Sequence, residues 1–279
     1  MAPASVPGPL LDLAAARSFC DGIDHAEGVA VHPDGSVWCG GEAGQVYRIA
    51  PDGSSLELRV EPTGGFTAAL AFGPDGLLYY VDIGQRAVFR LDPAGGAPQP
   101  FVAATVDGHE LRLPNAIAFD AAGNLFLTES WSATEPGPGV YRIDPGGRGE
   151  LWSSGPFLFA NGVAVAPDGD AIYVAETWSR RITRVPVLAD GSAGKPELHT
   201  DLPGTAPDGL GFGPDGLLYV ACYQPSQVMR IEADGEPVIL VRDDDAMLLA
   251  HPTNIAFRGQ TAFVANLGRW HIAAIEVAG

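Results

Sequence analysis

The chain has 279 residues, with 16 basic and 34 acidic side chains, a formal net charge of −18, and 36 glycines and 24 prolines. This charge excludes nucleic acid and anionic membrane surfaces as partners, because binding to phosphate groups needs clustered lysine and arginine. The one lysine, Lys195, lies in a turn-like stretch, so Schiff-base and P-loop chemistry lack a suitable residue.

The three cysteines indicate the compartment. Cys20, Cys39 and Cys222 lie far apart with no C-x-x-C pair, so we expect reduced thiols buried in strands. Residues 1–16 contain no lysine or arginine, unlike a secretory signal with a basic start. No apolar run approaches the roughly 20 residues of a membrane span. The sequence therefore predicts a cytoplasmic protein that makes no use of a membrane.

The first predicted element is a strand over residues 13–20. It precedes the repeats described next and has no blade of its own, so we expect it to complete the last blade, whose third strand is predicted over 271–277. A short helix over residues 10–19 is the alternative, which helix propensity favours. We expect residues 1–279 to form a single domain, with residues 1–12 as a loosely ordered extension.

A pattern of two apolar runs joined by a turn such as Pro-Asp-Gly recurs six times. The copies begin at residues 28, 69, 116, 162, 209 and 254, with spacings of 41 to 47 residues. This is the length of a four-stranded propeller blade. The strands in each copy are rich in aromatic and β-branched residues and are bounded by glycine and proline. The sequence predicts an all-β fold, a six-bladed β-propeller of four-stranded blades closed by an N-terminal strand.

Five third strands carry arginine at one aligned position, which we interpret as part of the scaffold because five identical copies cannot form one site. These residues are Arg48, Arg90, Arg142, Arg184 and Arg230. Their expected partners are the acids that end three second strands, Asp82, Glu129 and Glu176.

The residue before each innermost strand differs from blade to blade. The six occupants are Glu27, Ala68, Asn115, Asn161, Asp208 and Thr253. Innermost strands run side by side around the channel, so we expect these residues to form a ring at its mouth. Four of them carry carboxylate or carboxamide oxygens, which suit a hard cation such as Ca²⁺, Mg²⁺ or Mn²⁺, with Zn²⁺ as a further candidate. The alternative for any one of them is a side-chain turn to its own backbone.

The repeats and the segments that begin four of them resemble the SMP-30/gluconolactonase/LRE-like family of six-bladed propellers, from about residue 13 to 277. The segments are Glu27-Gly28, Pro114-Asn115, Asn161-Gly162 and Pro207-Asp208-Gly209. The resemblance implies that Glu27, Asn161 and Asp208 bind one divalent metal ion, Ca²⁺ before the others, and that Asn115 helps to hold substrate or a metal-bound water. It also implies lactone hydrolysis.

Two departures from the family pattern argue against a sugar lactone as substrate. The usual Glu-Gly-Pro-x-Trp opening is Glu-Gly-Val-Ala-Val at residues 27–31. The arginine that sugar lactonases place two residues before the asparagine is Leu113, with Arg112 one residue further back. Arg112 stays a candidate for substrate binding, and the pocket is expected to be more apolar than a sugar requires.

Two histidines lie where the mouth is predicted. His109 is in the long connection over residues 103–113, and His251 comes two residues before Thr253. Either is a candidate to contact substrate or to carry a proton. The alternative for both is a solvated or packed side chain.

Three aromatic residues occupy comparable places after second strands. Trp131 and Trp178 each follow an acidic strand end, and Tyr223 follows the fifth second strand. They are candidates for the wall of an apolar substrate pocket. Ordinary packing between blades is the alternative.

These observations predict a metal-dependent hydrolase that opens a lactone or related cyclic ester with a metal-activated water at the channel mouth. Asp208 is expected to accept a proton from that water and Asn115 to orient water or substrate. Two rivals belong to other classes: a strictosidine-synthase-like enzyme with non-hydrolytic natural-product chemistry, and a non-catalytic binding propeller. The expected partner is a small-molecule substrate, and the expected state is a monomer or weak homodimer.

Overall fold

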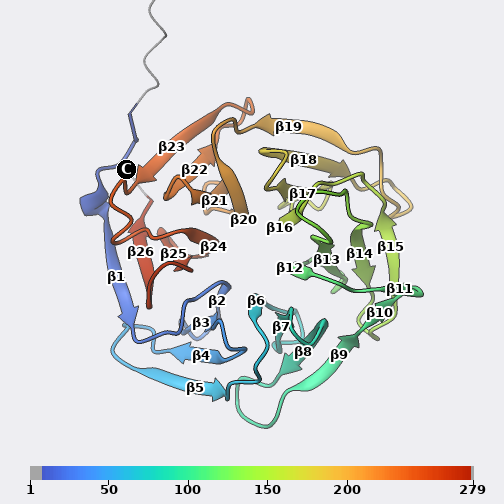
Figure 1. Ribbon diagram of the computed structural model, residues 1–279, viewed down its shortest axis with the longest axis horizontal. Helices are drawn as coiled ribbons and strands as arrows, with labels where there is room; N and C mark the ends of the chain where they lie inside the picture. The colour runs from blue at the N-terminus through green and yellow to red at the C-terminus, as the bar shows by residue number, and fades with distance from the viewer. Residues whose placement is uncertain (1–7, 278–279) are drawn as a thin grey trace, which may run out of the picture.

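Each of the six sequence repeats folds into one four-stranded antiparallel sheet, and the six sheets stand around a central axis (Figure 1). The computed structural model describes residues 8–277. Within that range the helical content is one three-residue 3₁₀ turn, Leu13–Ala15. The predicted six-bladed, all-β propeller is confirmed. None of the helical structure in residues 8–277 is long and apolar enough to cross a membrane.

Within each blade the chain runs from the channel outwards. Blade 1 consists of β2 (Val29–Val31), β3 (Val37–Gly40), β4 (Val46–Ile49) and β5 (Leu56–Val60). Blade 2 consists of β6 (Thr67–Phe72), β7 (Leu78–Asp82), β8 (Ala87–Leu91) and β9 (Gln99–Ala103). Blade 3 consists of β12 (Pro114–Phe119), β13 (Leu125–Glu129), β14 (Gly139–Ile143) and β15 (Gly149–Ser153). A small hairpin, β10 (Thr105–Val106) and β11 (His109–Glu110), lies in the connection between blades 2 and 3.

The second half of the ring repeats this arrangement. Blade 4 consists of β16 (Ala160–Val165), β17 (Ala171–Glu176), β18 (Arg181–Pro186) and β19 (Glu197–Asp201). Blade 5 consists of β20 (Ala206–Phe212), β21 (Leu218–Gln224), β22 (Gln227–Ile231) and β23 (Pro237–Arg242). Blade 6 consists of β24 (Pro252–Arg258), β25 (Thr261–Asn266), β26 (His271–Glu276) and the N-terminal strand β1 (Ala16–Asp21).

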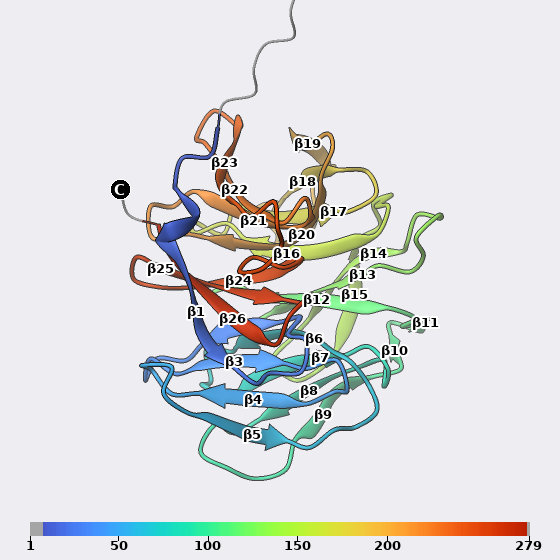
Figure 2. The same cartoon turned by 60° about the vertical axis from the view of Figure 1, so that its left-hand side comes forward.

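Strand β1 closes the ring by pairing with the last strand of the chain (Figure 2). It runs antiparallel to β26, from Ala16 opposite Ile275 to Asp21 opposite His271. The closing strand is thus confirmed over the helix alternative, although it begins three residues later than predicted. The pairing covers the edge of β26, whose backbone N–H and C=O groups would otherwise be unpaired.

The residues before β1 are described from residue 8 onwards. The predicted extension over residues 1–12 therefore lies partly outside the described residues. Within it, the backbone N–H groups of Leu10 and Leu11 donate to the carbonyl oxygens of Ile239 and Leu240, at 2.9 and 2.8 Å.

The core lies between neighbouring sheets, because the inner strands of every blade are covered on both faces. All five residues of β7 and all five of β13 are buried. This burial explains why the second strands read as continuous apolar runs rather than as alternating ones. The three cysteines are free, buried thiols in strands, as predicted: Cys20 lies in β1, and Cys39 and Cys222 lie in the second strands β3 and β21.

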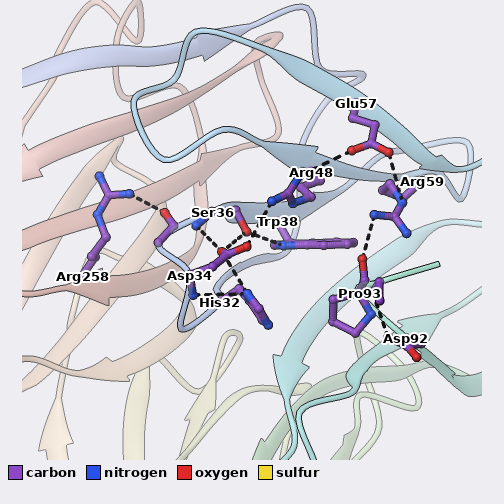
Figure 3. Close-up of polar contacts among 12 residues, drawn as sticks. His32, Asp34, Ser36, Trp38, Arg48, Glu57, Arg59, Asp92, Pro93 and Arg258 are labelled. Atoms are coloured by element: carbon purple, nitrogen blue, oxygen red, sulfur yellow. Dashed lines mark hydrogen bonds and ion pairs between the residues drawn. The ribbon is translucent and has the colours of Figure 1, made fainter.

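The aligned arginines of the third strands do not pair with the acids that end the second strands, so that prediction is wrong. In blade 1, Arg48 binds Asp34 in the turn after β2, with 3.0 Å between Nη2 and Oδ2 (Figure 3). The register explains the error. In blade 4, Arg184 stands opposite Tyr173, whereas Glu176 lies three residues, or about 10 Å, further along that strand. In blade 4, Arg184 likewise binds Asp170 in the turn after β16, with 2.7 Å between Nη2 and Oδ2, as a scaffold role requires.

Candidate active site at the channel mouth

Four polar residues from four blades lie buried where the innermost strands begin. Glu27, Asn115, Asn161 and Asp208 expose only 4 to 7% of their surface. In blades 3, 4 and 5 the pairing of the innermost strand is interrupted at this point; in blade 4 it passes from Ala160 directly to Val163. Such an irregularity changes the direction in which a side chain points.

The small residue after three of these positions is required by close contact between neighbouring blades. A Cβ atom on Gly162 would lie 2.2 Å from the carbonyl oxygen of Asp208, and one on Gly209 would lie 2.4 Å from that of Thr253. A Cβ atom on Gly28 would likewise lie 2.9 Å from the carbonyl oxygen of Ala68. The innermost strands therefore approach one another more closely than side chains allow.

Hydroxyl groups fix the orientation of the two ring amides. The Nδ2 group of Asn115 donates to Ser130 Oγ at 3.1 Å, and that of Asn161 donates to Thr177 Oγ1 at 3.1 Å. The Thr177 hydroxyl donates in turn to the carbonyl oxygen of Pro207 in blade 5, at 2.8 Å. Because each amide commits its NH₂ group to the scaffold, its Oδ1 atom is left free to accept.

Four of the seven buried side-chain polar atoms that lack a hydrogen-bond partner within residues 8–277 belong to this ring. They are Glu27 Oε2, Asn115 Oδ1, Asn161 Oδ1 and Asp208 Oδ1. A buried acceptor without a partner costs about 1–3 kcal/mol, so four at one site need an explanation. Two carboxylates and two carboxamides are a donor set that fits a hard divalent cation.

The two carboxyl groups of the ring influence each other. Burial raises the pKa of Glu27 well above its ordinary value, and the charge of Asp208 raises this pKa further. Burial also raises the pKa of Asp208, against the opposing effect of a hydrogen bond from Asn161. Two buried like charges favour the neutral forms unless a cation neutralises them. The ring thus has oxygens that suit a cation, and a cation bound there would offset the repulsion between the two carboxylates.

The backbone of Glu27 is positioned from blade 6. Its carbonyl oxygen accepts hydrogen bonds from Thr253 Oγ1 at 2.7 Å and from Asn254 Nδ2 at 2.9 Å. Thr253 therefore supports the ring rather than adding an oxygen to its centre. Sequence reasoning missed Asn254, Ser130 and Thr177. A comparison of the residue that follows each second strand would have identified Ser130 and Thr177, which carry hydroxyl groups at equivalent positions.

The acids that end three second strands fasten the segments that lead into the mouth. Each accepts a hydrogen bond from a backbone N–H group just before an innermost strand: Phe66 to Asp82 at 3.1 Å, Leu113 to Glu129 at 2.6 Å and Leu158 to Glu176 at 2.9 Å. All three acids are fully buried. They explain how loops at the mouth keep a fixed backbone.

Tyr223 and His251, which were predicted separately, lie against each other. Their rings stack with centroids 4.5 Å apart, and His251 Nδ1 donates to the carbonyl oxygen of Tyr223 at 2.9 Å. Burial raises the pKa of Tyr223, and so do the charges of Glu27 and Asp208. Tyr223 therefore lies within the electrostatic field of the ring carboxylates.

The remaining predicted residues divide between blades 3 and 4. The Arg112 guanidinium lies 3.7 Å from the centroid of the Trp131 ring, and His109 shares a cavity with Trp131. Trp178 is 49% exposed and packs against Phe159, with ring centroids 5.7 Å apart. The predicted residues thus fall into the ring, the stacked Tyr223–His251 pair and a blade 3 group of His109, Arg112 and Trp131. Trp178 contacts none of the other predicted residues that are described here.

A second set of potential metal ligands lies on blade 1. Ligand atoms of Asp24, His25 and Glu42 all lie within 4.8 Å of one another. This group differs from the ring, because Asp24 already accepts a hydrogen bond from Gln45 at 2.9 Å and the Glu42 side chain is 56% exposed. Its polar atoms have partners in the protein or in solvent, whereas four buried oxygens of the ring have none.

Comparison with known proteins places this geometry in a family. The model of the SMP-30/Gluconolactonase/LRE-like region matches residues 85–265, which include three of the four ring residues. The gluconolactonase of Zymomonas mobilis is 27% identical over 251 residues, 80% of this chain and 67% of that protein. The 6-deoxy-6-sulfogluconolactonase of Pseudomonas putida is 27% identical over 239 residues, 80% of this chain and 75% of that protein.

A solved structure shows the same fold. Regucalcin from Agrobacterium tumefaciens, described as a calcium-binding protein, has a TM-score of 0.78 and 19% identity, covering 97% of this chain and 96% of that one. The family match spans well over half of the chain and includes three of the four segments that begin blades, those with Asn115, Asn161 and Asp208. The chain therefore belongs to the SMP-30/gluconolactonase/LRE-like family.

Proposed function

We propose that this protein is a metal-dependent hydrolase that opens a lactone or a related cyclic ester at the channel mouth. The observation that carries this proposal is the set of four buried, unpartnered oxygens at the start of the innermost strands of four different blades. The two lactonase-named relatives described above support the reaction class. A small-molecule substrate is the corresponding partner.

Glu27, Asn161 and Asp208 would hold the divalent ion, and Asn115 would hold substrate or a water molecule bound to the ion. Ca²⁺ is our first choice, because the donors are all oxygens and a structural neighbour is described as calcium-binding. Mg²⁺, Mn²⁺ and Zn²⁺ are the other ions that such donors accept. When bound, the ion would supply a Lewis acid that polarises an ester carbonyl and makes water more acidic.

The residues of the chain have distinct roles in the proposed reaction. Water adds to the ester carbonyl carbon, and Asp208 accepts the proton that the water loses. The C–O bond within the lactone then breaks, and the alkoxide that leaves receives that proton, which gives a hydroxy acid. Asn115 orients the water or substrate, because its amide is fixed through Ser130 and its Oδ1 is free.

This proposal is tested by elemental analysis of the purified protein, followed by lactone hydrolysis with and without a chelator. We expect about one divalent ion per chain and loss of activity on chelation that the ion restores. We further expect alkyl- and aryl-substituted lactones to give a higher kcat/KM than gluconolactone. Apolar walls bury such groups at roughly 25 cal/mol per Å² but leave sugar hydroxyls unpaired. A higher kcat/KM for gluconolactone contradicts the apolar pocket, and no turnover of any lactone favours the non-hydrolytic rival.

The carboxyl pair also predicts how stability depends on pH once divalent ions are removed. Both pKa values are raised above their ordinary 4.5 and 3.8, so the stability they contribute is full below those values and is lost as pH rises through the folded pKa. We expect chelated protein to have a lower Tm at pH 8 than at pH 5, and Asp208→Asn to show a smaller decrease, because only the buried Glu27 still loses a proton. Thermal unfolding at both pH values checks this, and equal or higher stability at pH 8 would count against it.

Two further proposals concern the cellular location and the oligomeric state. A cytoplasmic location is supported by the three free, buried thiols. A monomer or weak homodimer is our proposal for the oligomeric state, which sedimentation of the purified protein would measure directly.

A further inference from the structure

In blades 3 and 4 the residue directly after the second strand contacts the ring residue of the same blade. These residues are Ser130, after β13, and Thr177, after β17. The Ser130 N–H group donates to the carbonyl oxygen of Leu113 at 3.0 Å, two residues before the ring residue. The Thr177 N–H group makes the same bond to Phe159 at 3.3 Å. Both side chains therefore start from equivalent backbone positions beside a ring amide.

Blades 2 and 6 have an aliphatic side chain at this position. The N–H groups of Ile83 and Leu267 make the same hydrogen bond, at 2.9 and 3.2 Å. The ring residues of these two blades are Ala68 and Thr253, which have no amide. Among these four blades, a hydroxyl group thus follows the second strand only where the ring residue is an asparagine. The comparison links the hydroxyl groups to the amides rather than to the scaffold that the four blades share.

Each of the two hydroxyl groups directs its single proton to the next blade. Ser130 Oγ donates to the carbonyl oxygen of Ala160 at 2.7 Å, and Thr177 Oγ1 donates to that of Pro207 at 2.8 Å. A carbonyl oxygen can only accept, so towards the neighbouring amide the hydroxyl oxygen can only accept as well. An amide oxygen turned towards it would leave two acceptors without a proton between them. The hydroxyl groups therefore determine which end of each amide faces the ring.

Burial makes the reversed amide orientation unfavourable. Ser130 is fully buried and Thr177 exposes 5% of its surface. Two buried acceptors that face each other both lose a hydrogen bond, and the desolvation of both groups stays uncompensated. A reversed amide would also present its NH₂ group to the ring, where a cation requires an oxygen. The hydroxyl groups thus keep an acceptor oxygen at two ring positions.

The two hydroxyl groups act on different parts of the proposed site. Thr177 connects two proposed ligands of the ion, because it holds the amide of Asn161 and binds the carbonyl group directly before Asp208. Ser130 holds the amide of Asn115, which is proposed to bind substrate or a water molecule. Loss of one hydroxyl group should therefore have a different consequence from loss of the other.

We propose that Thr177 and Ser130 are positioning residues of the site, Thr177 for binding of the divalent ion and Ser130 for the handling of substrate. Each acts through the amide whose oxygen it directs to the ring, without contacting ion or substrate itself. The proposal rests on the function proposed above, and it separates the residues that position the ion from those that position the reacting molecule.

The first test titrates chelated protein with Ca²⁺ in a calorimeter. Thr177→Val removes the hydroxyl group and keeps the volume, and we expect a Kd about tenfold or more weaker than in the parent protein. Thr177→Ala, which also lacks the hydroxyl group, should give the same result. Thr177→Ser retains the hydroxyl group, so its Kd should stay within about threefold of the parent value. A parent-like Kd in Thr177→Val, or an equally weak Kd in Thr177→Ser, overturns the assignment of Thr177.

Thr200→Val is the matched control. Thr200 lies in β19, the outermost strand of blade 4, and is 4% exposed. Its hydroxyl group donates to the carbonyl oxygen of Gly235 at 3.0 Å, so it also binds blade 5. We expect Thr200→Val to lose stability as Thr177→Val does, but to bind Ca²⁺ like the parent protein. A Kd that is equally weakened in both variants would reflect a general loss of contact between the blades and overturns the positioning role.

Ser130→Ala should separate turnover from ion binding. We expect kcat/KM for the best lactone to fall about tenfold or more, while the Kd for Ca²⁺ stays within about threefold of the parent value. Saturating Ca²⁺ should restore most of the turnover of Thr177→Val but none of that lost in Ser130→Ala. Recovery of both variants by Ca²⁺, or a parent-like kcat/KM in Ser130→Ala, overturns the assignment of Ser130.

Hydrogen exchange of the Asn161 amide separates failure of this proposal from failure of the proposed function, because it needs neither ion nor substrate. The side-chain NH₂ signal of Asn161 can be identified in chelated, ¹⁵N-labelled protein by its loss in Asn161→Ala. We expect its protons to exchange about tenfold or more faster in Thr177→Val than in Thr177→Ser, because the buried acceptor is gone. If the protein binds no ion or hydrolyses no lactone, faster exchange still supports the hold of Thr177 on the amide. Equal exchange in the two variants overturns it, whatever the activity.

Discussion

Asp208→Ala and Glu27→Ala are each expected to abolish binding of the divalent ion and to reduce kcat/KM for lactones about a thousandfold or more. Each change removes one of two anionic ligands, so the ion loses an oxygen and half of the neutralising charge. A thousandfold loss corresponds to about 4 kcal/mol of transition-state stabilisation, a reasonable share for a bound cation. Asn161→Ala should act similarly while the charge of the site is unchanged.

The measurement is calorimetric titration of chelated protein with Ca²⁺, alongside turnover of the best lactone. Asp24→Asn is the matched control, because it removes a carboxylate from the other cluster of potential ligands on blade 1. We expect this variant to bind the ion like the parent. If the three ring variants bind the ion normally while Asp24→Asn does not, the ion belongs to the blade 1 cluster and the ring assignment is wrong.

Gly162→Ala is expected to destabilise the protein by about 3 kcal/mol and to disturb the ring in the protein that still folds. The added Cβ atom would lie 2.2 Å from the carbonyl oxygen of Asp208 and 2.7 Å from Cα of Gly209. Both are backbone atoms, which cannot move without shifting blade 5 against blade 4. Overpacking of this kind typically costs 1–3 kcal/mol or more.

Denaturant unfolding of the chelated protein measures this effect without the contribution of a bound ion. The control is Ala116→Gly, because blade 3 already carries a Cβ atom at the equivalent position. We expect that variant to lose less than about 1 kcal/mol, the cost of glycine in a strand. Equal stability of Gly162→Ala and the parent would show that the innermost strands are further apart than the structure has them.

Much of the fold follows from the sequence because blade boundaries are local signals. A turn such as Pro-Asp-Gly and the apolar runs beside it specify a hairpin wherever they occur, and their recurrence every 41 to 47 residues fixes the number of blades. The same recurrence identifies Glu27, Asn115, Asn161 and Asp208 as equivalent positions. Equivalent positions of neighbouring blades must lie side by side around an axis, so the ring could be predicted without coordinates.

The tertiary structure decided what depends on contacts between sheets. The amide of Asn161 is oriented through Thr177 to a carbonyl group of blade 5, and the backbone of Glu27 is fixed by Asn254, more than 200 residues away. The partners of the arginines were mispredicted because strand register, which the repeat pattern does not specify, places them far from Glu129 and Glu176. The cavity that His109 and Trp131 share likewise arises where the hairpin β10–β11 meets the long turn over residues 130–138. Sequence periodicity determines which residues are equivalent, whereas the stacking of twisted sheets determines which residues touch.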